Sequence, residues 1–588
     1  MRTKTALLIV LFLAASLATT SATQEESWVA RSDRNSEVLL EVMARFNPEG
    51  AGFMGVNGLD EEILQLDPDR DTRRIAALET AVTELRSRLE QEPDSRVRLD
   101  LEILIESAEL NIRGIRLNRE HLLPYVNLPR IVFQGARSLL DEQNSPEQHA
   151  AAAVRLRRYA GLEEGFTPIF EQAEALIRSR LPKHDLVGPF LGELERDLGN
   201  SNDYIKGIRD LLASFEVTGA DTAVDVLEGH VRSFDEFLRT EVQPRARKGF
   251  RLPPEIYALT LENMGIDMPV SELASRAQVS FREIQNEMQV IAALIARNQD
   301  LESSDYRDVI RHLKLDQLVG EEILTTYTRR IAELERIIEE QSVVTMPQRE
   351  MRIRLASEAE SAAIPSPFML PPRLIGNTGE MGEFVLPYRT ADNNESDPNR
   401  VDDYTFDAAS WTLAVHEGRP GHELQFTAMI EDGVSLARSL FAFNSVNVEG
   451  WALYCEAEMK PTFPLEGQLI SLQQRLLRAA RAFLDPGMQS GATSTEEAVR
   501  LLIHEVVLSP ALARQEMDRY TFDDPGQATS YFCGYLRLME LRTEVELRMG
   551  QNFDRQEFHD FILSQGLLPP RLVRQAVLEG FVGLADEF

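Results

Sequence analysis

The sequence predicts a mostly α-helical protein, built as a large helical body with an internal cleft. Of its 588 residues, 43% are hydrophobic, so the chain is long and apolar enough to bury a large core. Four long segments place apolar residues three and four positions apart, as one face of a helix requires. These segments span residues 71–91, 97–117, 271–299 and 323–341. We find no internal repeat of fixed period, which argues against a solenoid of regular units.

The charge balance excludes one class of partner. The chain carries 95 acidic and 62 basic side chains, which gives a formal net charge of −33. A surface of this sign repels a polyanion over most of its area. We therefore expect no nucleic-acid partner.

Residues 1–22 predict a secretory signal peptide. Arg2 and Lys4 precede an apolar run from Ala6 to Ala18, and Thr20-Ser21-Ala22 is typical of a cleavage site. The run is shorter than the roughly 20 residues that span a bilayer, and no cysteine follows it to carry a lipid anchor. We expect a secreted or periplasmic protein with no stable membrane span after cleavage. An uncleaved membrane anchor is the alternative.

The helical pattern breaks near residue 360, where we place a boundary. Residues 23–360 are the expected N-terminal helical region, and residues 361–588 are the expected C-terminal metal-binding catalytic region. The two regions either form separate domains or pack together as one body. At the break, residues 363–388 are rich in Pro and Gly, and two apolar runs flank the turn Gly376-Asn377-Thr378-Gly379. This pattern predicts a small β-hairpin or edge strand.

Cys455 and Cys533 are the two cysteines, so no disulfide framework holds the fold together. One bridge between them and two buried free thiols are both compatible with the sequence. The redox state therefore stays open at this stage.

The stretch VHEGRPGHELQ, residues 415–425, contains the candidate metal ligands. In H-E-x-x-H zinc peptidases, two histidines four residues apart share one helical face, and the glutamate between them acts as a base. Here His416 and His422 are six apart, which rotates the second about 240° away in a regular helix at ~100° per residue. Pro420 and Gly421 should interrupt the helix, and a widened turn could return His422 beside His416. The spacing alone leaves a metal site and two unrelated histidines as alternatives.

A glutamate further along the chain supplies a third candidate ligand. Glu449 lies in VNVEGWALYCEAE, 27 residues after His422. Two imidazoles and one carboxylate leave one zinc coordination position open for water. The alternative for Glu449 is an acid near a helix start, stabilised by the helix dipole. The pair His504-Glu505 has no second histidine at either spacing, and we expect no metal there.

Three motifs, HEGRPGHELQ, EGWALYCEAE and PGQATSYFCGYLRLMELR, follow one another between Val415 and Arg542. Together they resemble the bacterial domain-of-unknown-function 885 family, whose members carry H-E-x-x-P-G-H followed by E-G-W-A-L-Y. The resemblance covers most of the mature chain. That family is similar to the helical gluzincin peptidases, such as thimet oligopeptidase and angiotensin-converting enzyme, in which two histidines and a downstream helix glutamate bind zinc. The resemblance thus implies a gluzincin-like helical fold.

The resemblance also implies roles for individual residues. His416, His422 and Glu449 would bind Zn²⁺, and Glu417 would act as the general base. A carboxylate beside the first ligand can take a proton from water and pass it to the leaving amine. Tyr531 is our candidate for stabilising the oxyanion, because a phenol donates a hydrogen bond. A core tyrosine at a helix interface is the alternative for Tyr531.

Other residues are weaker candidates for substrate binding. Arg537 and Arg542 could clamp a substrate carboxylate through two parallel hydrogen bonds. The segment from Gly376 to Leu386 could present an edge to an extended peptide by strand addition, or form only a surface turn. Gln489 stands where many members of the resembled family have a histidine, and glutamine cannot gain or lose a proton near neutral pH. This departure concerns the mechanism more than metal binding.

These features lead to one hypothesis and two alternatives. We expect a secreted or periplasmic zinc metallopeptidase that acts on a peptide or small amide substrate, by a carboxypeptidase, dipeptidase or oligopeptidase mode. The alternatives are a metal-dependent hydrolase of a non-peptide amide and a catalytically silent helical protein that binds peptides. The retained Glu417 argues against a silent protein. The sequence leaves the oligomeric state open.

Overall fold

Most of the described chain is α-helical, as the sequence predicts. The computed structural model describes residues 26–356, 360–361, 366–388 and 400–583. All four segments with helical periodicity form helices, namely α3 (Arg70–Gln91), α4 (Ser95–His121), α11 (Val270–Asn298) and α13 (Glu321–Glu340). The predicted signal peptide, residues 1–22, lies outside the described residues. No helix in the described ranges is both long and apolar enough to cross a bilayer.

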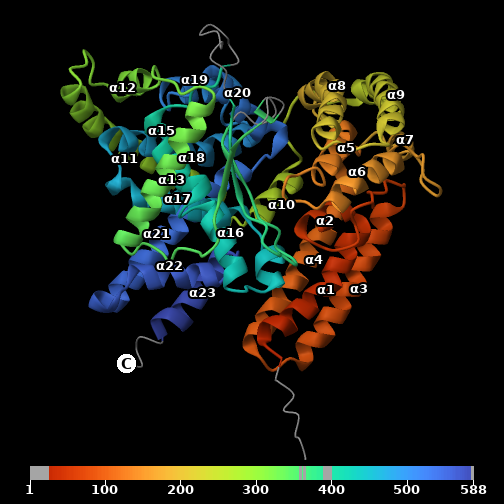
Figure 1. The fold of residues 1–588 in the computed structure, drawn as a ribbon, viewed down its shortest axis with the longest axis horizontal. Coiled ribbons are helices and arrows are strands. Elements are labelled where there is room, and N and C mark those ends of the chain that lie inside the picture. The colour runs from red at the N-terminus through yellow and green to blue at the C-terminus, as the bar shows by residue number, and fades with distance from the viewer. Residues whose placement is uncertain (1–25, 357–359, 362–365, 389–399, 584–588) are drawn as a thin grey trace, which may run out of the picture.

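The N-terminal helices form two groups on one side of the molecule (Figure 1). The first group packs around a core that includes Leu85, Leu101 and Leu104. Besides α3 and α4 it contains α1 (Trp28–Phe46) and α2 (Pro48–Met54). The second group packs around a core that includes Leu156 and Tyr159. Its helices are α5 (Leu128–Arg137), α6 (Pro146–Tyr159), α7 (Ile169–Arg180), α8 (Leu191–Ser214) and α9 (Asp221–Phe237).

The helices from α11 onward surround the largest core and lie on the opposite side of the molecule (Figure 1). This core includes Trp451, Leu476 and Phe532, which come from α17 (Ser445–Met459), α18 (Leu465–Ser490) and α21 (Ser530–Met549). The described residues also form the α-helices α10 (Pro254–Met264), α12 (Tyr306–Leu313), α15 (Asp407–Leu413), α16 (His422–Glu431), α19 (Thr495–His504), α20 (Pro510–Asp518), α22 (Arg555–Ser564) and α23 (Pro570–Ala576).

A small three-stranded sheet lies in the middle of the molecule (Figure 1). Its strands are β1 (Arg352–Leu355), β2 (Phe368–Leu370) and β3 (Glu383–Leu386), in the order β1-β3-β2. Strand β3 pairs antiparallel with β2, with Phe368 opposite Val385, and parallel with β1, with Ile353 opposite Phe384. The predicted hairpin is therefore present as β2 and β3, and β1 is an addition that the sequence did not indicate.

The position of β3 limits where a peptide could bind by strand addition. Strand β3 is hydrogen-bonded on both sides, so the part of the Gly376-to-Leu386 segment that forms it has no free edge. Strand addition needs an unpaired row of backbone groups. A peptide cannot add to β3, and only β1 and β2 stand at the edges of this sheet.

Two features connect the regions on either side of residue 360. The sheet joins β1, before this residue, to β2 and β3 after it. The buried carboxylate of Asp100 in α4 accepts hydrogen bonds from Ser435 Oγ at 2.6 Å and Arg438 Nε at 2.7 Å. The division into residues 23–360 and 361–588 stays a prediction, and these contacts hold the two parts against each other.

Candidate metal centre

The helix that carries His416 is interrupted before His422, where the sequence places Pro and Gly. Helix α15 passes into a π-helical turn over Ala414–Gly418, and α16 begins anew at His422. The backbone N–H of Gly421 donates to the carbonyl of Val415 over 2.9 Å and closes this loop. The rings of His416 and His422 thereby lie 4.7 Å apart between centroids.

Gly421 is required by the close approach of the backbone in this loop. A Cβ atom at this position would lie 2.1 Å from the carbonyl oxygen of His416 and 2.2 Å from that of Val415. Both neighbours are backbone atoms of the turn itself and cannot move aside. A glycine is therefore the residue that lets the chain return His422 to the side of His416.

Neighbouring elements hold the interrupted segment in place. Arg419 Nε donates to the buried carboxylate of Glu423 at 2.7 Å, and its Nη1 reaches Glu335 in α13 at 2.9 Å. The indole N–H of Trp451 in α17 donates to the carbonyl of Pro420 at 2.9 Å. The loop is thus fixed by helices on both of its sides.

Glu449 of α17 completes a group of three metal-type donors. Its Oε2 lies 3.5 Å from His416 Nε2 and 3.3 Å from His422 Nε2, and the ligand atoms of the three residues all lie within 4.8 Å of one another. Two donors bound to one tetrahedral zinc at about 2.0–2.1 Å are about 3.3–3.4 Å apart. The observed separations are those of donors that face a common ion.

Unpaired polar atoms support the same conclusion. Glu449 Oε2 and His422 Nδ1 are buried, and neither has a hydrogen-bond partner among the described residues. A buried carboxylate oxygen without a donor is costly. An ion between the three side chains would offset this cost at Glu449 Oε2, so the residues present fit a divalent metal.

A close helix crossing brings Glu449 near the C-terminal motif. Gly450 of α17 meets Gly534 of α21, where a Cβ on Gly450 would lie 2.5 Å from the Cα of Gly534. A Cβ on Gly534 would lie 2.0 Å from the carbonyl oxygen of Val446. Two facing glycines therefore let α17 and α21 approach closely, and α21 places Tyr531 at the site.

Glu456 is a functional candidate that the sequence reasoning missed. Its Oε1 lies 2.7 Å from His416 Nδ1, and its Oε2 accepts a hydrogen bond from Thr412 Oγ1 at 2.6 Å. Because a carboxylate only accepts, Nδ1 must carry the proton, and in the neutral ring Nε2 keeps a lone pair that faces Glu449. Glu456 follows Glu449 by seven residues, which is the same face of a helix two turns on, and this spacing was the available signal.

The charges around the three side chains favour a cation at the site. Burial lowers the pKa of His416, but the contacts with Glu449 and Glu456 outweigh it and raise that pKa to about 9. Burial alone would raise the pKa of Glu449, yet the two histidines hold it well below its usual range. Positive charge is stabilised here, whether it is carried by a proton or by a metal.

Glu417 differs from these neighbours because its carboxylate accepts no hydrogen bond from the described residues. Burial raises its pKa, and the nearby histidines offset this only in part. No described side chain or backbone group donates a hydrogen bond to its carboxylate. A half-buried, unengaged carboxylate with a raised pKa is suited to accept a proton from water.

Tyr531 lies beside the first histidine. Its ring stacks on that of His416, with centroids 6.2 Å apart and an interplanar angle of 16°. Arg519 Nη1 donates to its hydroxyl oxygen over 3.3 Å. The phenol proton is therefore free to point toward another acceptor, as the predicted role in stabilising an oxyanion requires.

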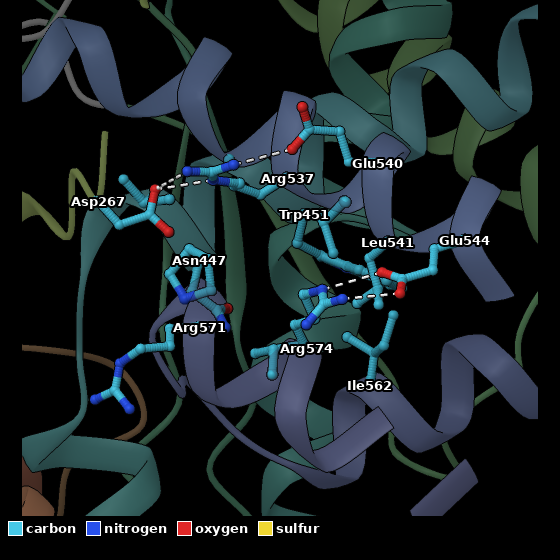
Figure 2. A pocket seen from close by; sticks show the side chains of 15 residues that line it. Asp267, Asn447, Trp451, Arg537, Glu540, Leu541, Glu544, Ile562, Arg571 and Arg574 are labelled. Atoms are coloured by element: carbon cyan, nitrogen blue, oxygen red, sulfur yellow. Dashed lines mark hydrogen bonds and ion pairs between the residues drawn. The ribbon is translucent and has the colours of Figure 1, made fainter. Parts of the chain in front are cut away.

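Two of the weaker candidates are held in ion pairs. Figure 2 shows Arg537 directed toward Asp267 and Glu540 at a pocket of about 370 Å³, and its Nη2 lies 2.8 Å from Asp267. Arg542 pairs with Glu458 and with Glu546, and donates to the hydroxyl of Tyr454 at 2.9 Å. Both guanidinium groups already have acidic partners.

The remaining candidates lie in structural positions. Gly376 lies in the connection between β2 and β3 and has a φ of 61°. The preceding residue, Ile375, donates its backbone N–H to the carbonyl of Met54 in α2 at 2.9 Å. Gln489 is buried, donates to the carbonyl of Tyr520 at 2.7 Å and accepts from the N–H of Leu252 at 3.0 Å. Gln489 thus links two segments through its side-chain amide.

The structure also shows the state of the two cysteines and the surroundings of the pair His504-Glu505. Cys455 and Cys533 are buried free thiols, which answers the question that the sequence left open. Glu505 pairs with Arg307 at 2.6 Å and belongs to no group of metal-type donors among the described residues.

Comparison with known proteins gives a family and a fold. The profile of a family described as "Bacterial protein of unknown function (DUF885)" matches residues 48–577. A protein described as a lipoprotein of unknown function from Shewanella oneidensis is 20% identical, with a TM-score of 0.71 over 94% of this chain and 100% of its own. A protein described as a lipoprotein from Colwellia psychrerythraea is 16% identical, with a TM-score of 0.75 over 95% of this chain and 100% of its own. At these identities the likeness shows the fold alone.

Other comparisons add little. A protein described as an oligoendopeptidase F from Bacillus anthracis str. Ames is 11% identical over 87% of this chain and 96% of its own, with a TM-score of 0.25. That score is too low to support an argument. No curated protein matches the chain.

Proposed function

The chain belongs to the DUF885 family of bacterial proteins of unknown function, and we propose that it is a zinc-dependent hydrolase of peptide bonds. One observation carries the proposal: the donor atoms of His416, His422 and Glu449 converge within 4.8 Å, next to the unengaged carboxylate of Glu417. Two imidazoles and one carboxylate are a common ligand set of catalytic zinc, and they leave a coordination position open.

The site residues can carry out hydrolysis of an amide in two proton transfers. When bound, Zn²⁺ supplies a Lewis acid that polarises the carbonyl and lowers the pKa of water. Glu417 takes a proton from the attacking water while the water oxygen bonds to the carbonyl carbon. Glu417 then gives this proton to the amine nitrogen as the C–N bond breaks, which yields a carboxylic acid and an amine.

Two further residues support this chemistry. Tyr531 is directed by Arg519 and would donate its phenol proton to the carbonyl oxygen as negative charge develops there. Glu456 holds His416 in the tautomer that presents Nε2 to the metal. Both assignments use contacts that exist in the folded chain before any substrate binds.

Glu417→Gln tests the proposal directly. We expect wild type to cleave members of a mixed peptide library, and the variant to lose about 10²–10⁴-fold in rate because glutamine cannot accept the proton. Mass spectrometry of the products reports both the activity and the bond that is cut. Zinc content should be equal in the two proteins, since Glu417 is not a ligand.

Glu505→Gln is the matched control, because Glu505 also follows a histidine but pairs with Arg307. It should cleave the library as wild type does. Equal cleavage by wild type and Glu417→Gln, or none by either, would refute the proposed reaction.

A further inference from the structure

Three guanidinium groups surround Tyr531 beside the metal centre. Arg478 and Arg481 of α18 stack over its ring, with their Cζ atoms 5.6 Å and 4.7 Å from the ring centroid. Arg519, just after α20, donates to its hydroxyl. The ring of Tyr531 in turn stacks on His416, so the three cations are grouped around a residue that touches the site.

Arg481 is the one of these three cations that forms a bidentate ion pair with a carboxylate. Arg481 donates from Nε and Nη2 to the two oxygens of buried Glu516, at 2.8 Å and 2.7 Å. Glu516 also accepts from the hydroxyl of Tyr520 at 2.7 Å. Arg519 Nε lies 3.8 Å from Glu516 Oε1, which is longer than a hydrogen bond, and both oxygens of Glu516 already accept hydrogen bonds.

Arg478 also lacks a dedicated partner. Its Nη2 lies 3.9 Å from Glu456, whose oxygens are held by His416 and Thr412. Its hydrogen-bond partner is Gln474, an uncharged group on the same helix. Its Nε is buried, with no hydrogen-bond partner among the described residues. The side chain is 7% exposed, so this is a buried cation with no carboxylate oxygen at hydrogen-bond distance.

Arg519 is connected to the metal ligands through one glutamine. Arg519 Nη1 donates to Gln527 Oε1 at 3.1 Å, and Gln527 Nε2 donates to Glu449 Oε1 at 3.2 Å. The side chain of Arg519 is 27% exposed and that of Glu449 is 16% exposed. Both side chains therefore keep part of their surface exposed.

We infer that Arg478 and Arg519 form a subsite that binds a carboxylate of the substrate beside the metal centre. The inference rests on the proposed function and adds a substrate class to it. Two guanidinium groups near a divalent cation repel it and each other, and a carboxylate between them would offset that repulsion. Guanidinium groups also match a carboxylate with two parallel hydrogen bonds.

Two kinds of peptide carry such a carboxylate close to the bond that is cut. A free C-terminal carboxylate would make the protein an exopeptidase that removes residues from the C-terminal end. An acidic side chain would make it selective for Asp or Glu beside the scissile bond. The recognition chemistry is the same in both cases, and the test separates them.

Binding is measured in the Glu417→Gln background with zinc present, so that the result does not depend on cleavage. The probes are N-acetylated Ala-Ala-Ala as the free acid and as the amide, and the amides of N-acetylated Ala-Glu-Ala and Ala-Gln-Ala. We expect the carboxylate form of one pair to bind about 10–100-fold more tightly than its amide, the range for a hydrogen-bonded charge. The pair that shows the difference identifies the source of the carboxylate.

Adding Arg519→Gln or Arg478→Gln should remove most of this preference while leaving the affinity of the uncharged peptides unchanged. Arg548→Gln, an exposed arginine of α21 that pairs with Glu544, is the matched control and should keep the preference. If the buried Arg478 variant fails to fold, as judged by circular dichroism, the partly exposed Arg519 variant carries the test.

Two outcomes would overturn the subsite. The first is equal binding of acid and amide in both pairs. The second is a preference that survives both arginine substitutions, which would place the carboxylate on the metal itself. An arginine-dependent preference in a protein whose wild type cleaves no peptide would instead refute the proposed reaction and leave the subsite standing.

Discussion

At the scale of single residues, the candidate centre depends on carboxylates with different tasks. Glu449 faces both histidines through one oxygen, and Glu456 fixes the ring of His416 from the other side. Glu417 has no hydrogen-bonding partner among the described groups and is left for proton transfer. In the proposed reaction the same side chain type would serve as ligand, as orienting group and as base, because each carboxylate meets different neighbours.

Glu456→Gln tests the orienting role. The amide can still contact His416 and Thr412, but the negative charge that makes the imidazole a better donor to the metal is lost. We expect zinc affinity to fall by about 10–100-fold, as for other partners of metal-bound histidines. Competition with a chelator of known affinity measures the change.

Glu458→Gln is the control for Glu456→Gln. Glu458 lies on the same helix in an ion pair with Arg542 and does not contact the histidines. Its zinc affinity should equal that of wild type. Equal losses in the two variants would show that Glu456 acts only on the stability of α17.

At the scale of elements, the site is made by an interruption and a close crossing. The π-helical turn Ala414–Gly418 and the loop to His422 bring two histidines together that a regular helix would separate. The contact of Gly450 with Gly534 then sets α17 against α21. Both devices use glycine for the same reason, since no Cβ fits where backbones approach this closely.

Gly421→Ala should therefore destroy the metal centre. The added Cβ would lie 2.1 Å from a backbone oxygen, so the turn must open and move His422 away. We expect a loss of about 1–3 kcal/mol in the free energy of unfolding, the range for overpacking, together with loss of bound zinc. Denaturant unfolding and metal analysis of the purified protein measure the two effects.

Gly199→Ala gives the matched comparison, because a Cβ at this position in α8 meets no atom within 4 Å. It should retain zinc and gain stability by about 0.5–1 kcal/mol, since alanine is the better helix residue. Zinc bound equally by the Gly421 and Gly199 variants would contradict the role of the turn.

At the scale of the whole molecule, the centre joins segments that also pack and hydrogen-bond to one another. Its residues come from the turn after α15, from the start of α16 and from α17. Tyr531 comes from α21, about eighty residues further on. A bound ion would connect these helices within the largest core, so we expect it to stabilise the fold as well as the site.

Metal removal tests this coupling. At a free zinc concentration about 1,000-fold above Kd, binding to the folded state alone contributes about 4 kcal/mol to stability. Wild type should therefore melt at a lower temperature after chelation and recover when zinc is returned. Differential scanning calorimetry measures the change in Tm.

His416→Ala should show no such shift, because one of the three ligands is missing. It should also be purified with less zinc than wild type. A chelator effect of the same size in wild type and in His416→Ala would show that the stabilising ion binds elsewhere.

The helices could be predicted because their signals are local, whereas the candidate ligands needed a family resemblance in addition to their spacing. Apolar spacing of three and four is repeated within α3, α4, α11 and α13, and each helix formed within two residues of its predicted ends or extended beyond them. The turn at Gly421 was expected from the residue types alone. Strand β1 was missed, since its four residues carry no pattern without the β3 partner that pairs with them.

The sequence by itself determined the helical fold and the interruption before His422, and its resemblance to a known family indicated the three candidate metal ligands. The tertiary structure decided which other groups meet them: Glu456 behind His416, Tyr531 beside it, and Arg478 and Arg519 around that tyrosine. The difference has a physical cause. Helix formation depends on residues three and four apart, whereas a buried charge finds its partner only where helices distant in sequence pack together.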